Sequence, residues 1–106
     1  MKNLIWLAFD LGVQGDYEGI YGWLDERQAK ECGDGLACLQ FSFTGDLTAA
    51  LQKDLKGRVK ITPTARIYAI WSDAGRMKGR FIVGKRRAAP WTGFGALALQ
   101  EEDSDA

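Results

Sequence analysis

The side chains in this sequence whose type and spacing best suit catalysis or ligand binding are carboxylates and cations. Asp10 directly follows the apolar run 4–9, and sites in α/β proteins tend to form where central strands end. Mg²⁺ needs only one or two carboxylates plus water. Asp10, with its copy across a dimer, is therefore a candidate metal ligand and catalytic residue. The alternative is that Asp10 caps the loop 11–15 by accepting hydrogen bonds from its backbone N–H groups.

A second group of candidates consists of cations that bracket an expected strand near residue 80. Alternation along a strand places every second side chain on the same face, so the first three of these cations should share a face. Together with Trp91 and Phe94 they could bind a phosphate backbone and stack on bases. The alternative is that they protect a sheet edge from pairing with other chains. The candidate nucleic-acid-binding residues are Arg76, Lys78, Arg80, Lys85, Arg86 and Arg87.

The remaining reactive residue types limit which chemistry is available. The chain has no histidine, so it lacks the usual general base and the commonest transition-metal ligand. Cys32 and Cys38 match no zinc-binding spacing, and we expect reduced thiols, with a disulfide as the alternative. Catalysis would have to use carboxylates, Lys, Tyr or a bound Mg²⁺.

Charge is distributed unevenly along a chain of 106 residues whose formal net charge is zero. Residues 1–50 carry three cations and eight acids, a net −5, and residues 51–100 carry eleven cations and two acids, a net +9. The last six residues add four acids. The two halves could pair within the chain or between subunits, or the basic half could bind an anionic partner. The apolar run 4–9 is too short for a signal peptide or a membrane span, so we expect a cytoplasmic protein.

Hydrophobic periodicity predicts the elements that would position these groups. The run 4–9 suits a strand covered on both faces, and alternation over 36–43 indicates a second strand. Asp16 and Asp46 are N-cap residues for two helices. We expect the first helix to continue until the glycines at 33 and 35 end it. Trp23 lies beside its apolar stripe, and we expect it either to be partly exposed or to flank the core. We expect the second helix to end near Gly57.

The C-terminal half reads as a hairpin followed by a less regular segment. Residues 65–71 and 76–85 form the two strands around the turn 72–75, with a bulge or an edge at Gly79 or Gly84. We expect Trp91 and Phe94 to dock on the domain. Residues 1–100 would form the domain, and residues 101–106 an acidic, disordered tail.

The expected order β-α-β-α-β-β predicts a single α/β (α+β) domain. Right-handed crossovers make a split β-α-β, ferredoxin-like arrangement the simplest solution, with the last strand at an edge or exchanged with a partner. The predicted core consists of Leu4, Trp6, Ala8, Tyr17, Ile20, Leu24, Leu39, Phe41, Leu51, Leu55, Ile67 and Ile70.

The first two-thirds of the chain resembles small ferredoxin-like proteins related to the CRISPR adaptation subunit and to the GhoS-type antitoxin. The resemblance lies in the segment 4–10, a strand that ends in Phe9-Asp10, and in the helix opening Asp16-Tyr17-Glu18-Gly19-Ile20-Tyr21. It implies a homodimer. Some members of these families are metal-dependent nucleases, whereas others are adaptors. The segment from Gly79 to Phe94 belongs to neither family and indicates an uncharacterised bacterial subfamily.

These observations favour a non-enzymatic, dimeric regulator or adaptor that contacts protein or nucleic acid and needs no cofactor. The alternative is a nuclease that uses Asp10 and Mg²⁺. Three features favour the first hypothesis: the absence of histidine, the single well-placed acid, and the absence of a basic residue close behind Asp10, the first arginine being Arg27.

Overall fold

The computed structural model describes residues 1–96, and these residues form a mixed α+β domain. Five strands and two helices follow one another along this part of the chain. In sequence order they are β1 (Lys2–Asp10), α1 (Tyr17–Glu26), β2 (Lys30–Gly33), β3 (Leu36–Ser42), α2 (Leu47–Arg58), β4 (Arg66–Asp73) and β5 (Arg76–Val83).

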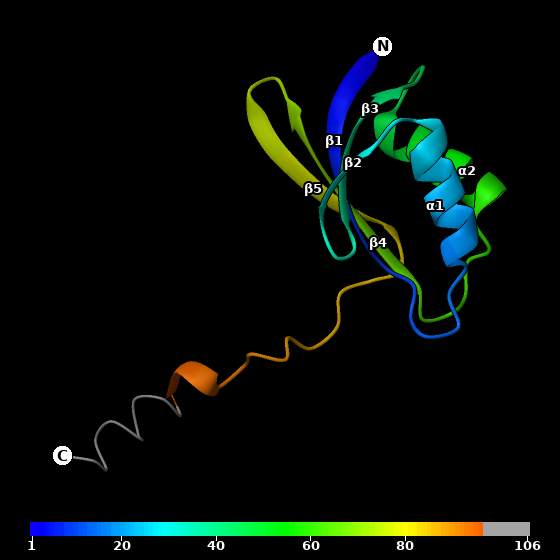
Figure 1. Cartoon of the computed structure of the whole chain (residues 1–106). Helices are drawn as coiled ribbons and strands as arrows, with labels where there is room; N and C mark the ends of the chain where they lie inside the picture. The colour runs from blue at the N-terminus through cyan, green and yellow to red at the C-terminus, as the bar shows by residue number, and fades with distance from the viewer. Residues whose placement is uncertain (97–106) are drawn as a thin grey trace.

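The strands form one antiparallel sheet in the order β2-β3-β1-β4-β5. β1 lies at the centre, where Trp6 pairs with Cys38 of β3 on one side and with Ile70 of β4 on the other. Both helices lie on the same side of this sheet (Figure 1). Within residues 1–96 the domain therefore has two layers, and one face of the sheet carries neither α1 nor α2.

The core lies between the sheet and the two helices. Ile5 and Leu7 of β1 are fully buried there, in one cluster with Ile20 of α1 and with Leu51 and Leu55 of α2. Burying an aliphatic side chain of this size stabilises a fold by about 1.5–3 kcal/mol. The predicted core residues that are buried in this layer are Ile20, Leu24, Leu39, Phe41, Leu51, Leu55 and Ile67. Tyr17 is half-buried and packs against the cluster, so its prediction is confirmed only in part.

The prediction that β1 is covered on both faces is wrong. Leu4 remains 39% exposed, and Trp6, Ala8 and Ile70 are only half-buried, because these four residues point away from the helices. An uninterrupted apolar run looks the same whether one face of the strand is covered or both, so the sequence could not separate the two cases. We call this helix-free surface the open face of the sheet.

Both N-cap predictions are confirmed. The Asp16 side chain accepts a hydrogen bond from the backbone N–H of Gly19 at the start of α1, and Asp46 does the same for Ala49 at the start of α2. Asp16 also accepts from the backbone N–H of Lys60, at 2.9 Å. This carboxylate therefore ties the start of α1 to the chain just beyond α2.

The predicted end of α1 is wrong, and a strand was missed there. The helix ends at Glu26, and residues 30–33 form the short edge strand β2, which pairs with β3. The turn between β2 and β3 contains Gly35 with φ +72°, and an added Cβ there would lie 2.6 Å from the carbonyl oxygen of Phe9. The glycines therefore close a hairpin instead of ending a helix. α2 ends at Arg58, one residue beyond Gly57.

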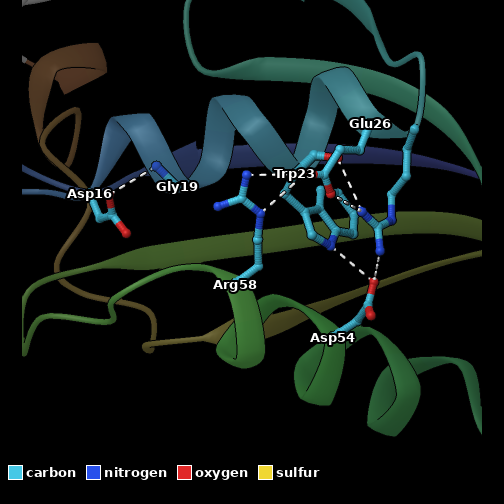
Figure 2. A network of polar contacts seen from close by, with 7 residues as sticks. Asp16, Gly19, Trp23, Glu26, Asp54 and Arg58 are labelled. Atoms are coloured by element: carbon cyan, nitrogen blue, oxygen red, sulfur yellow. Dashed lines mark hydrogen bonds and ion pairs between the residues drawn. The ribbon is translucent and has the colours of Figure 1, made fainter.

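A polar network holds α1 against α2 (Figure 2). Trp23, for which partial exposure and a place flanking the core were the two expectations, is 1% exposed. Its indole N–H donates to Asp54 of α2 at 2.9 Å. Arg27 donates to the same carboxylate and lies over the Trp23 ring, 4.3 Å from its centroid. Arg58 pairs with Glu26 at 3.0 Å. These contacts hold α1 and α2 in place relative to each other, and the sheet packs against both helices.

The segment that follows β5 leaves the domain (Figure 1). We call residues 84–96 the C-terminal arm. Trp91 is 74% exposed and Phe94 is 63% exposed, so the prediction that they dock on their own domain is wrong. Within the arm, the backbone N–H of Thr92 donates to Ala89 and that of Phe94 donates to Trp91, and residues 94–96 form a short helical turn. The predicted tail 101–106 and the end of the predicted domain, 97–100, lie outside the described residues.

Neither helix in the part of the chain that the structure describes is long and apolar enough to cross a membrane.

Candidate nucleic-acid interface

The open face brings together three aromatic side chains from three neighbouring strands. Tyr68 of β4 pairs in register with Phe81 of β5, and their rings meet edge to face with centroids 4.8 Å apart. Trp6 lies on the adjacent strand β1, diagonally across from Tyr68, because Ala8 is the partner of Tyr68 and Ile70 is the partner of Trp6. Diagonal neighbours on paired strands lie within reach of aromatic side chains. All three rings are half-buried, so part of each remains accessible.

Gly79 explains how Tyr68 lies on this face. An added Cβ at Gly79 would lie 2.4 Å from the Tyr68 hydroxyl oxygen and 2.8 Å from its ring. The Tyr68 ring therefore leans across the backbone of β5, in the space that any other residue would fill. This arrangement presents the ring as part of the surface. Gly79 lies on the edge strand β5, one of the two alternatives predicted for it, and it also makes room for an aromatic residue.

Cations border the aromatic rings. The guanidinium of Arg86, at the start of the C-terminal arm, lies 5.9 Å from the centroid of the Phe81 ring. Lys30 of β2 pairs with Cys38, whose other neighbour is Trp6, so Lys30 lies on the same face at the opposite edge. Aromatic rings flanked by exposed cations form a surface that suits single-stranded nucleic acid, because the rings stack on bases and the cations contact phosphates.

The structure separates the predicted cation cluster into two groups. Arg76, Lys78 and Arg80 share a face as predicted, but they pair with Asp73, Trp71 and Ala69 on the helix side of the sheet. Their face is opposite to the three aromatic rings. The Lys78 side chain also forms an ion pair with Asp73, with Nζ 2.7 Å from Oδ2. Lys85, Arg86 and Arg87 follow β5 on the exposed arm.

Trp91 and Phe94 belong to the arm and do not lie beside the β5 cations, so the predicted combination of these two groups does not form. The aromatic residues of the open face were missed as a site. Their signal in the sequence was an aromatic residue in each of three predicted strands, Trp6, Tyr68 and Phe81, of which we assigned only Trp6 to the core.

Asp10 lies at the end of β1, as predicted, and is 58% exposed. Its carboxylate accepts a hydrogen bond from the backbone N–H of Gly12 at 3.1 Å, the loop-capping geometry of the alternative interpretation. Its other oxygen lies 3.8 Å from Nη2 of Arg66. Within residues 1–96, no group of three or more His, Cys, Asp or Glu side chains could hold a metal ion. A carboxylate already paired with a guanidinium and lacking further ligands is a poor fit to Mg²⁺ within one protomer.

Two carboxylates at the helix starts have lowered pKa values, and both serve as N-cap residues. The backbone N–H groups of Lys60 and Gly19 hold the pKa of Asp16 below its ordinary value. For Asp46, the hydroxyl of Thr48 and the backbone N–H of Ala49 lower the pKa. Hydrogen bonds to the charged form favour it. Neither group lies among the three rings of the open face.

The cysteines are both free; Cys32 is exposed on β2 and Cys38 is half-buried on the open face. Comparison with protein-family models, with curated proteins and with solved structures found no match to this chain.

Proposed function

We propose that this chain is a non-enzymatic adaptor that binds single-stranded nucleic acid on the open face of its sheet. The observation that carries the proposal is the set of Trp6, Tyr68 and Phe81 on three adjacent strands, with Arg86 over the Phe81 ring. A base stacked on an aromatic side chain contributes about 1–3 kcal/mol. Sheet surfaces with aromatic residues on neighbouring strands are a recurrent way of holding two or three bases.

The proposal includes a ferredoxin-like arrangement for the domain. In its support, β3 lies between β1 and β2, and β1 lies between β3 and β4, which is how two split β-α-β units interlock. β5 is then an added edge strand that widens the open face and supplies Phe81. A cytoplasmic location and a homodimer are also part of the proposal.

Binding of labelled oligonucleotides, followed by fluorescence anisotropy, tests this function. We expect single strands to bind better than duplexes, because only unpaired bases expose their faces to aromatic rings. Replacing Trp6 by Ala should raise Kd roughly 5- to 150-fold, the equivalent of about 1–3 kcal/mol. Arg86→Ala should reduce the slope of log K against log salt by about 1. Arg76→Ala, on the opposite side of the sheet, is the matched control and should change the affinity least.

The same samples test the alternative function, a Mg²⁺-dependent nuclease that uses Asp10. Oligonucleotides incubated with Mg²⁺ or Mn²⁺ should stay intact if the chain is an adaptor. Cleavage that disappears in an Asp10→Ala variant would contradict the proposal. Failure of every oligonucleotide to bind would contradict it as well.

A further inference from the structure

The exposed arm and an acidic groove on the same chain have complementary properties. The groove lies between α1 and the β2–β3 hairpin and encloses about 370 Å³. Its lining includes both apolar or aromatic side chains and carboxylates, namely Phe9, Tyr21, Leu24, Asp25, Glu31 and Asp34. Lys30 is the cation among its lining residues. Tyr21 stays 57% exposed there, although it contacts the rings of Phe9 and Tyr17.

The arm carries the opposite charge and two largely exposed aromatic side chains. Lys85, Arg86 and Arg87 begin it, and its described residues 84–96 contain no acid. Trp91 and Phe94 follow, both largely exposed. Large aromatic side chains held in water by a segment that leaves its own domain mark an interaction surface. Three of the eleven cations of residues 51–100 thus lie on the arm, and three of the eight acids of residues 1–50 line the groove.

We propose that the arm of one copy docks in the acidic groove of a second copy, and that the exchange is reciprocal. The inference rests on the homodimer contained in the proposed function and names the surfaces that form it. Trp91 and Phe94 would cover Tyr21 and Phe9, while Lys85 and Arg87 would lie near the groove carboxylates. A two-fold axis makes each copy both donor and acceptor, and such an interface closes without further growth.

The area available matches what a stable dimer needs. A buried aromatic side chain covers about 150–250 Å². Two such residues from each of two arms bury about 600 Å² on the arm side and a similar area in the grooves. The total of about 1,200 Å² reaches the lower bound for specific protein interfaces. Arg86, held over Phe81, stays on the open face and remains available there.

A charge-reversal experiment on the full chain tests the exchange. In the variant Lys85→Glu/Arg87→Glu, the arm and the groove are both acidic, and in Asp25→Lys/Glu31→Lys both are basic. Each variant alone should raise the dimer dissociation constant at least tenfold at low salt. An equimolar mixture should restore the dimer, because each arm then meets a groove of opposite charge. Mass from light scattering at roughly 100 μM, with circular dichroism to confirm folding, reads out both results.

An aromatic variant provides the second line of evidence. Trp91→Ala/Phe94→Ala should be monomeric, whereas Met77→Ala, which removes an exposed apolar side chain on β5, should dimerise like the unmodified chain. The inference is overturned by a monomeric unmodified chain, by single variants that remain dimeric, or by a mixture that stays monomeric. These masses are measured without nucleic acid, so a failure here is separate from a failure of oligonucleotide binding.

Discussion

Replacing Asp54 by Ala tests the packing of the helix layer most sharply. The Asp54 carboxylate accepts from the indole N–H of Trp23, which is 1% exposed, and from Arg27. The substitution leaves a buried donor without its acceptor, at a cost of about 1–3 kcal/mol. The ion pair itself, with side chains 27% and 40% exposed, adds only about 0.2–1 kcal/mol. We expect a total loss of about 2 kcal/mol.

Thermal and urea unfolding, followed by circular dichroism, measure this loss. For a domain of this size, about 2 kcal/mol corresponds to a fall in Tm of roughly 8–16 °C. Asp73→Ala is the control, because within residues 1–96 the Asp73 side chain forms only an exposed ion pair with Lys78. This substitution should cost less than about 1 kcal/mol. In a Trp23→Phe background, which lacks the indole N–H, the Asp54 substitution should lose most of its effect. Equal losses for Asp54 and Asp73 would refute the reasoning.

Three other substitutions test separate parts of the structure. Gly79→Ala should displace the Tyr68 ring, whose hydroxyl oxygen lies 2.4 Å from the position of the new Cβ, and should weaken oligonucleotide binding in the anisotropy assay. Gly57→Ala, with open space around it in α2, should stabilise the domain by about 0.5–1 kcal/mol, measured by urea unfolding. Asp16→Asn should destabilise the chain at pH 7. Because the pKa of Asp16 is lowered from 3.8 in the folded state, its charged form stabilises the fold above pH 3.8, and the difference between the two chains should vanish as pH falls through the folded-state pKa. A difference that grows with acid would contradict this.

The elements that the sequence predicted correctly depend on short-range signals. Asp16 and Asp46 each accept from a backbone N–H three residues later, so their N-cap roles are visible in a short window. The turn at Ala74-Gly75, with φ of +52° and +80°, likewise joins two adjacent strands. Alternation in residues 36–43 predicted the buried face of β3 for the same reason.

The features that the sequence did not predict depend on distant partners. Trp23 is buried because Asp54, 31 residues later, accepts its indole N–H. β2 consists of four mostly exposed residues, and only pairing with β3 distinguishes it from the polar end of a helix. The open face also escaped prediction, because an apolar side chain such as Trp6 reads as core until the positions of both helices are known.

The arm shows a different limit of sequence reasoning. Trp91 and Phe94 are residue types that usually pack against their own domain, yet the chain leaves the sheet after Val83 and carries them into solvent. Composition cannot say whether an aromatic residue covers its own core or that of another copy.

The most direct test of the central claim compares two substitutions of one residue on the open face. Tyr68→Phe keeps the ring that would stack on a base, and Tyr68→Ala removes it. With a labelled single-stranded oligonucleotide, we expect Tyr68→Phe to bind like the unmodified chain and Tyr68→Ala to raise Kd roughly 5- to 150-fold. Equal affinity of all three proteins, or no binding by any of them, would contradict the assignment of the open face as a nucleic-acid interface.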